Sequence, residues 1–320
     1  MSTESTMSTT AVRGGAAREQ RYREAERRLW DSVGVTPAER RVQLPRNGVS
    51  VRIQEVGDGP PALFIHGGPN SGSTWAPLVG KLRGIRCWII DRPGTGLSDP
   101  LRLDARTLPG FADGFVADVL DALEISRAHL VASSVGGYIA LRSAAAHPDR
   151  IDRVVQMGCP AFVPGMRIPP FMRFLLFPGA RYLMGALPPN DRANRTVFRQ
   201  IGHGASLDAG RVPQVFLDWY LALQRDTDTM RNETAMIARL GSIRGYDRSL
   251  TLSPALLGSV RAPTRFLWGE DDTFGGAEVA RTTVAHLPNA GLELVPRAGH
   301  LPWIDDPDRA AQLTTTFLLG

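Results

Sequence analysis

The sequence has few of the residues that mark a disulfide-rich, metal-binding or nucleic-acid-binding protein. Its 320 residues include only two cysteines, Cys87 and Cys159, each in or beside an apolar run. We predict two buried free thiols, because a disulfide framework or a metal site needs more cysteines or ligand spacing. Lys81 is the single lysine, so the net charge of +5 comes almost entirely from arginine. The arginines are scattered along the chain, which argues against a nucleic-acid partner.

Long apolar runs are also missing. The most apolar candidate for a membrane span, residues 168–187, is interrupted by prolines, glycines and arginines, whereas a transmembrane helix needs about 20 mostly apolar residues. The first residues are polar and lack the apolar centre of a secretory signal. With 43% hydrophobic and 22% charged residues, the composition is typical of a soluble enzyme. We therefore expect a cytoplasmic protein without a membrane partner.

The amino-terminal region divides into two segments. Residues 1–17 are rich in Ser, Thr, Gly and Ala, and we expect a disordered tail there. Residues 18–34 are predicted to form an amphipathic helix that docks on the core. The apolar side chains at helical spacing in that helix are Tyr22, Ala25, Leu29 and Trp30.

From about residue 41 the pattern alternates between short apolar runs and helical segments. This alternation predicts an α/β fold with a mostly parallel sheet covered on both faces. The expected strands lie at 51–56, 62–65, 87–90, 130–132, 154–157, 264–268 and 292–295, and the expected helices at 111–124, 135–147, 276–287 and 307–319.

Residues 160–256 break this rhythm and contain no convincing buried strand. We predict an all-helical cap there, with helical pieces near 170–178, 191–202, 211–226 and 228–240. Such a cap would cover the carboxyl ends of the strands, where α/β sheets hold their ligands.

The strongest chemical signal is the run Leu130-Val131-Ala132-Ser133-Ser134-Val135-Gly136-Gly137. A buried strand enters a turn and a helix follows at once, which is the setting of a nucleophile elbow. The residues two before and two after the nucleophile must be small, because the strand and helix backbones approach closely there. Ala132 and Gly136 meet this requirement for Ser134, whereas Ser133 would place Val131 and Val135 at the crowded positions. Ser134 is therefore the predicted nucleophile, with Ala132 in place of the usual first glycine.

A second signal is the turn His66-Gly67-Gly68-Pro69 after an apolar run. A glycine-rich turn leaves backbone N–H groups free to face a ligand, and such groups stabilise the oxyanion in acyl transfer. The predicted donors are the N–H groups of Gly68 and Val135. His66 is expected to be hydrogen-bonded within the turn and not to act as a base.

Two further signals supply an acid and a base. Asp271 and Asp272 follow a late apolar strand, and His300 lies in a loop after the last one. Asp272 is our choice for the residue that orients His300, with Asp271 as the alternative. The order Ser134, Asp272, His300 is the order of a catalytic triad on an α/β-hydrolase sheet.

Together these motifs resemble the α/β-hydrolase superfamily over about residues 41–320. The resemblance implies a mostly parallel eight-stranded sheet with helices on both faces and a helical cap inserted after strand six. The core would comprise residues 18–159 and 257–320, and the cap residues 160–256. The Gly-x-x-Asp pattern at 269–272 matches the family's acid position and favours Asp272. The segment 91–99 resembles the stretch after the family's fourth strand and is expected to shape the loop beneath the site.

The resemblance implies acyl transfer without a metal or organic cofactor. We predict hydrolysis of an ester, lactone or thioester of a small, fairly apolar substrate through an acyl-enzyme on Ser134. Capped relatives also include carbon–carbon bond hydrolases, whereas epoxide hydrolases and haloalkane dehalogenases use an aspartate nucleophile. Phe162, Phe274 and Trp303 are candidate substrate contacts. The alternatives are a lyase or cyclase of natural-product tailoring and a ligand-binding protein with a vestigial triad. The oligomeric state does not follow from the sequence.

Overall fold

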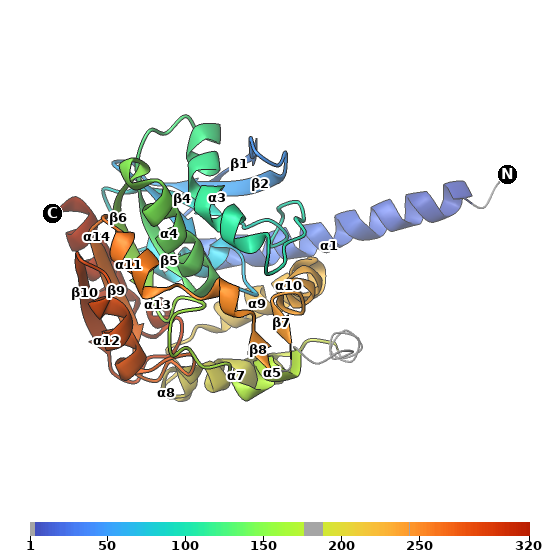
Figure 1. Cartoon of the computed structure of the whole chain (residues 1–320). Coiled ribbons are helices and arrows are strands. Elements are labelled where there is room, and N and C mark those ends of the chain that lie inside the picture. The colour runs from blue at the N-terminus through green and yellow to red at the C-terminus, as the bar shows by residue number, and fades with distance from the viewer. Residues whose placement is uncertain (1–3, 176–187, 243) are drawn as a thin grey trace.

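A sheet of eight strands forms the centre of the protein (Figure 1). The computed structural model describes residues 4–175, 188–242 and 244–320. The strands are ordered β1-β2-β4-β3-β5-β6-β9-β10 across the sheet. Their bounds are β1 Ala38–Gln43, β2 Ser50–Val56, β3 Pro61–Ile65, β4 Arg86–Ile90, β5 Ala128–Ser133, β6 Ile151–Met157, β9 Thr264–Gly269 and β10 Ala290–Val295. The β2 strand is antiparallel to both neighbours, and all pairs from β4 to β10 are parallel. The predicted mostly parallel α/β sheet is confirmed.

Helices cover both faces of this sheet. Because side chains alternate along a strand, one strand serves two cores. Leu63 and Ile65 of β3 pack with α3 and α4, whereas Ala62 and Phe64 pack with α1, α2 and α14. The bounds of the core helices are α1 Glu4–Ser32, α2 Ala76–Val79, α3 Leu108–Ala122, α4 Ser134–Ala146, α11 Pro254–Ser259, α12 Ala277–Ala285, α13 Pro302–Asp305 and α14 Pro307–Leu319.

Helix α1 is longer than the sequence predicted. It begins at Glu4, where a disordered tail over residues 1–17 was expected. A helix that is already nucleated by its docked part can be continued by the residues before it without a new nucleation cost. Figure 1 shows its amino-terminal part projecting from the body of the molecule. The four apolar side chains predicted to dock the helix (Tyr22, Ala25, Leu29 and Trp30) are all buried.

Docking of α1 also changes the environment of β2. Arg52 and Gln54 of β2 are polar residues, yet both side chains are buried. Glu26 of α1 forms a buried ion pair with Arg52 at 2.6 Å, and Arg52 also contacts Asp91 at 3.3 Å. A buried cation needs such paired acids to offset its desolvation. Helix α1 can therefore cover the polar face of β2 because the carboxylate of Glu26 neutralises the guanidinium of Arg52.

The chain between β6 and β9 carries the region predicted as a cap. Its helices are α5 Pro170–Leu175, α7 Asp191–Phe198, the π-helical turn η3 Arg199–His203, α8 Gly204–Asp208, α9 Gln214–Asp226 and α10 Thr229–Ile237. They agree with the predicted helical pieces, although the end of the piece at 170–178 lies outside the described residues. The region is not entirely helical, because β7 Gly241–Ser242 and β8 Gly245–Tyr246 form a two-stranded hairpin. Two-residue strands are too short to leave an alternating pattern in the sequence.

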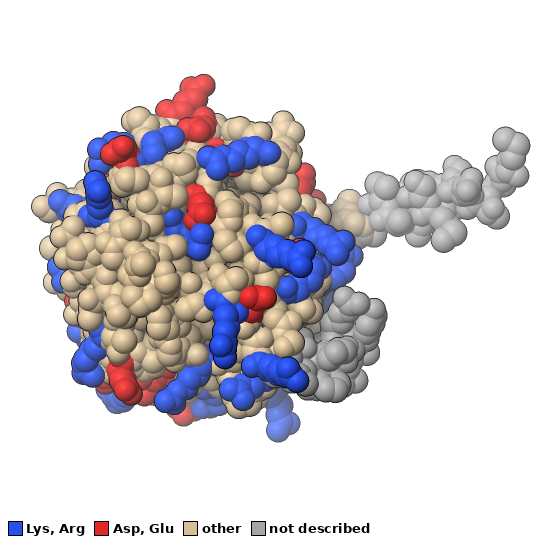
Figure 2. Space-filling view, in the orientation of Figure 1, with Lys and Arg blue, Asp and Glu red and all other residues tan. Residues whose placement is uncertain are grey.

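Charged side chains of both signs are spread over the face of the molecule drawn in Figure 2. Several Lys and Arg side chains adjoin one another on the side from which the amino-terminal helix projects. Many arginines form ion pairs, such as Arg127 with Asp152 and Arg150 with Asp121. Among the described residues, no helix combines the length and the hydropathy needed to cross a bilayer.

Candidate active site

Ser134 lies at a strained turn between β5 and α4. Its φ angle is +51°, a region that costs a residue other than glycine about 1–3 kcal/mol and is found mainly at functional sites. A Cβ atom on Gly136 would lie 2.0 Å from the carbonyl oxygen of Ile65, so only glycine fits there. Ala132 is fully buried beside β3 and is small enough for the turn to form. The local structure therefore has the geometry of a nucleophile elbow at Ser134.

Asp272 and His300 form a buried pair beyond the ends of β9 and β10. His300 Nδ1 lies 2.9 Å from Asp272 Oδ2. The backbone N–H of Cys159 donates to the same oxygen at 2.8 Å, and the N–H of Phe274 donates to Oδ1 at 3.0 Å. Both oxygens of Asp272 are thus engaged, which fixes the plane of the carboxylate. The alternative acid, Asp271, is exposed.

Ser134 and His300 follow strands that end at the same edge of the sheet. Their strands end at the carboxyl edge, where the loops after β3, β5, β9 and β10 converge. Between these two described residues the structure records no hydrogen bond. Catalytic hydrogen bonds are often long in a ligand-free enzyme and shorten when substrate binds.

The turn after β3 faces Ser134. A Cβ atom on Gly67 would lie 2.7 Å from Ser134 Cβ, so the turn and the serine side chain are adjacent. Val135 is the second residue of α4, and its N–H therefore has no acceptor within the helix. The two predicted oxyanion donors, Gly68 and Val135, come from the two segments that meet at Ser134.

His66 holds this turn together as a neutral imidazole. Its Nδ1 donates to the carbonyl of Gly67 at 2.6 Å, and its Nε2 accepts the N–H of Arg92 at 3.2 Å. Burial, together with the Arg92 guanidinium, holds the pKa of His66 well below its usual value. The expectation that His66 is bonded within the turn is confirmed.

The sequence did not reveal Glu233 of α10, which reaches the same turn. Glu233 pairs with Arg92 at 3.1 Å, and both side chains are buried. Arg92 also donates to the carbonyls of His66 and Gly67 at 2.9 and 3.1 Å. A Cβ atom on Gly68 would lie 2.1 Å from Glu233 Oε2. A lone acid on an amphipathic helix carries no signal in the sequence, so only the fold could reveal this contact.

The three candidate substrate contacts occupy different environments. The ring of Phe274 lies 4.2 Å from the imidazole of His300. Phe162, at a φ angle of +62°, packs edge-on against Tyr138 and Tyr246.

The expectation for Trp303 is corrected. Its ring stacks on Trp75 at 4.1 Å in the core, and its Nε1 donates to the carbonyl of Thr74 at 2.8 Å. The side chain is fully buried. Trp303 lies three residues after His300 in the sequence, which suggested that it lines the pocket. Helix α13 begins at Pro302, however, and the Trp303 ring points into the core.

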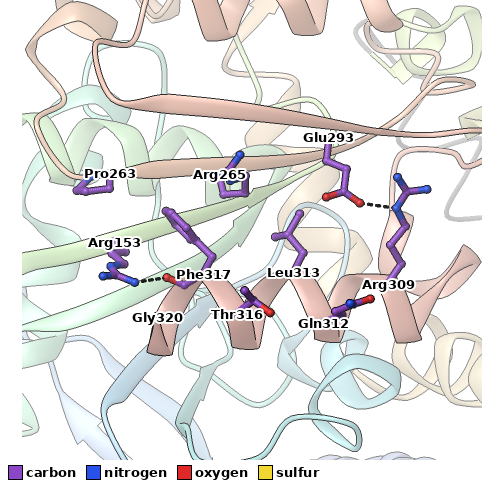
Figure 3. A pocket seen from close by; sticks show the side chains of 10 residues that line it. All are labelled: Arg153, Pro263, Arg265, Glu293, Arg309, Gln312, Leu313, Thr316, Phe317 and Gly320. Atoms are coloured by element: carbon purple, nitrogen blue, oxygen red, sulfur yellow. Dashed lines mark hydrogen bonds and ion pairs between the residues drawn. The ribbon is translucent and has the colours of Figure 1, made fainter.

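A surface cavity of about 610 Å³ lies elsewhere, between α14, the amino-terminal halves of β6 and β9, and Glu293 of β10 (Figure 3). Figure 3 shows Leu313 and Phe317 of α14 pointing toward the strands that carry Arg265 and Glu293. Arg309 pairs with Glu293, and Arg153 donates to the carbonyl of Phe317. Ligands of α/β sheets bind at the opposite, carboxyl ends of the strands, so this cavity is not the candidate active site. Within the described ranges, no three His, Cys, Asp or Glu side chains gather as metal ligands.

Comparison with known proteins agrees with the fold. Among solved structures, a carboxylesterase from Bacillus subtilis has a TM-score of 0.74 at 20% identity, covering 94% of this chain and 98% of its own. A meta-cleavage product hydrolase from Pseudomonas fluorescens has a TM-score of 0.67 at 20% identity, covering 88% and 97%. At 20% sequence identity, these two structures show a shared fold and do not show a shared substrate.

Curated sequences are also similar over most of the chain. A 2-hydroxy-6-oxononadienedioate/2-hydroxy-6-oxononatrienedioate hydrolase from Paraburkholderia phymatum is 28% identical over 300 residues, covering 87% of this chain and 94% of its own. A 2-hydroxy-6-oxo-6-phenylhexa-2,4-dienoate hydrolase from Burkholderia cepacia is 27% identical over 289 residues, covering 87% and 95%. The sequence model described as alpha/beta hydrolase family matches residues 62–313. The chain therefore belongs to the alpha/beta hydrolase family.

Proposed function

We propose that this protein is a serine hydrolase that cleaves an ester, lactone or thioester of a small, fairly apolar substrate. The observation that carries the proposal is the buried Asp272–His300 pair at the same sheet edge as the strained Ser134. Strain at one residue, a fixed acid–base pair and a glycine-rich turn are the parts that acyl transfer requires.

In this mechanism Ser134 Oγ attacks the carbonyl carbon while His300 Nε2 takes its proton. Asp272 keeps the proton of the imidazole on Nδ1 and stabilises the imidazolium that forms. The N–H groups of Gly68 and Val135 bind the oxyanion. His300 then protonates the leaving group, which departs and leaves an acyl-enzyme. A water molecule, deprotonated by His300, attacks the acyl group and releases the acid.

The charges at the turn favour a substrate that is uncharged near its carbonyl. Glu233 places a buried carboxylate beside Gly68, and the nearby cation, Arg92, is already paired with it. A substrate carboxylate in this place would face the Glu233 oxygen without a free cation from Arg92. Phe274 beside His300 adds an apolar wall. An ester, lactone or thioester meets these conditions.

A second candidate is hydrolysis of a carbon–carbon bond next to a ketone. It is favoured by the curated relatives, which are named as hydrolases of 2-hydroxy-6-oxo dienoates and match 87% of the chain. Those substrates carry carboxylates, so this candidate requires a cation other than Arg92 in the bound state. Relative activity on uncharged esters and on a 2-hydroxy-6-oxo dienoate distinguishes the two.

The test uses purified full-length protein and the Ser134→Ala variant. A fluorophosphonate probe should label the wild-type protein at Ser134, as peptide mass spectrometry would show, and should not label the variant. Short-chain nitrophenyl esters, lactones and thioesters should be hydrolysed only by the wild type. Ser133→Ala is the matched control, because it removes the neighbouring hydroxyl and should keep both labelling and activity. If folded wild-type protein neither reacts with the probe nor cleaves any of these substrates, the proposal is wrong.

Labelling without hydrolysis would favour the lyase or cyclase alternative. In that case Ser134→Ala is expected to retain part of the activity on the true substrate. Preferential cleavage of the dienoate would favour the second candidate.

A further inference from the structure

A second histidine–aspartate pair lies behind the loop that carries His300. His203, the last residue of η3, is fully buried, and its Nδ1 lies 2.8 Å from Asp305 Oδ2 of α13. His203 is enclosed because η3 lies close against the loops after β9 and β10. A Cβ atom on Gly202 would lie 2.2 Å from the carbonyl oxygen of Asp271 and 2.8 Å from Gly299 Cα.

This pair and η3 hold three successive backbone N–H groups around His300. The N–H of Gly299 donates to Asp305 Oδ2 at 2.8 Å. The N–H of His300 donates to the carbonyl of Ile201 at 2.9 Å. The N–H of Leu301 donates to His203 Nε2 at 3.2 Å. Residues 299–301 therefore have their backbone fixed by groups from η3 and by Asp305.

The hydrogen bonds also define the protonation of His203. A backbone N–H only donates, so His203 Nε2 must accept from Leu301 and carry no proton. The ring proton is then on Nδ1 and is donated to Asp305, which makes His203 a neutral imidazole of one tautomer. His203 thus acts as a fixed link between Asp305 and the backbone of the loop.

We propose that His203 and Asp305 are positioning residues that hold His300 in register with Ser134 and Asp272. The proposal rests on the proposed function, in which His300 is the base. Neither residue touches the reacting atoms, and both act through the backbone of residues 299–301. A displacement of about 1 Å at a catalytic group can cost about 100-fold in rate. Loss of the hydrogen bonds that His203 and Asp305 make to residues 299–301, here called the clamp, should therefore lower turnover. His203 belongs to the chain between β6 and β9, so this inserted region would help to assemble the catalytic base.

The experiment compares Asp305→Ala, Asp305→Asn and His203→Ala with the wild type on a nitrophenyl ester. Asp305→Ala and His203→Ala should lower kcat by about 10- to 100-fold and change KM by less than about threefold, because substrate contacts are unaffected. Asp305→Asn should recover most of kcat, since its amide oxygen can accept from both Gly299 and His203. Its NH₂ would replace Oδ1, which makes no hydrogen bond in the structure. A residue needed only for folding would not give this split between kcat and KM.

Thr314→Ala is the matched control for lost stability. It removes a buried hydroxyl of α14 that bonds to the carbonyl of Ala310 at 2.7 Å and lies on another element. All variants are compared at a temperature well below their melting temperatures, and the control should keep wild-type kcat. Amide hydrogen exchange of a peptide covering residues 298–302 should be faster in Asp305→Ala and unchanged in Thr314→Ala.

The proposal is overturned if folded Asp305→Ala and His203→Ala keep kcat within about twofold of the wild type, or if Asp305→Asn fails to recover it. Failure of the proposed function gives a different result, in which the wild type itself neither reacts with a fluorophosphonate nor cleaves any ester. In that case amide hydrogen exchange still tests whether the clamp holds the backbone of residues 299–301. Unchanged exchange at 298–302 in Asp305→Ala would overturn the proposal.

Discussion

The oxygen of Asp272 that faces His300 also accepts the backbone N–H of Cys159. The two donors lie 2.9 and 2.8 Å from Oδ2, and the other oxygen is taken by the N–H of Phe274. Cys159 follows the end of β6, so the strand next to β9 fixes the acid. The carboxylate uses both oxygens as acceptors, which a neutral amide cannot do.

Asp272→Asn should therefore disable the enzyme without unfolding it. Asparagine offers one acceptor oxygen and turns an NH₂ group toward either Phe274 or the pair Cys159 and His300. Because asparagine is neutral, the negative charge that stabilises the imidazolium is also lost. We expect kcat for a nitrophenyl ester to fall by about 10⁴-fold. Asp271→Asn, at the exposed neighbour, should keep kcat within about twofold. A larger loss in Asp271→Asn than in Asp272→Asn would reverse the assignment of the acid.

Gly136→Ala tests the geometry of the elbow. The added Cβ would lie 2.0 Å from the carbonyl oxygen of Ile65, so β3 and α4 must separate. We expect loss of fluorophosphonate labelling together with a lower melting temperature. Gly110→Ala is the control, since a Cβ there meets nothing within 4 Å in α3, and alanine should stabilise that helix by about 0.5–1 kcal/mol. Full labelling of Gly136→Ala would contradict the close approach.

Glu233→Gln tests the effect of charge at the turn. Glutamine can keep a hydrogen bond to Arg92 through its oxygen while removing the buried negative charge beside Gly68. Arg92 then has no anionic partner and should attract a substrate carboxylate. We expect KM for a 2-hydroxy-6-oxo dienoate to fall relative to KM for an uncharged ester. An unchanged ratio would show that Glu233 does not influence substrate charge.

The depressed pKa of His66 predicts a loss of stability in mild acid. Burial and the Arg92 guanidinium lower the pKa of His66 in the folded protein well below the usual 6.5. The unfolded chain therefore binds a proton that the folded protein does not, and stability falls as the pH drops below about 6.5. Melting temperatures measured from pH 8 to pH 5 should fall less in His66→Asn, which keeps a donor for the Gly67 carbonyl. A parallel decline in both proteins would exclude His66 as the cause.

Both cysteines should be inert in the folded protein. Burial raises the pKa of Cys87 to about 12, and burial with the nearby Asp272 carboxylate raises the pKa of Cys159 well above its usual value. The thiolate is the reactive form. At pH 8 a disulfide exchange reagent should therefore detect no thiol in the native protein and two in denaturant. Rapid reaction of a native thiol would place that cysteine at the surface.

The sequence by itself determined the order and type of the main elements. Apolar runs such as 62–65 and 130–132 had to be buried strands, and the small residues around Ser134 marked the turn where strand and helix meet. The order of Ser134, Asp272 and His300 pointed to one edge of the sheet. These features follow from local periodicity and steric rules, which a single chain displays directly.

Only the tertiary structure decided which distant side chains meet. Glu26 covers Arg52, Glu233 reaches Gly68, and His203 lies against Asp305 and the loop of His300. The partners in each of these contacts are far apart in the chain, and a lone charged residue on a helix leaves no periodic signal. Trp303 is the opposite case, because its position near His300 suggested the pocket and packing on Trp75 placed it in the core. Burial and pairing depend on how elements pack, so they are properties of the fold and not of the local sequence.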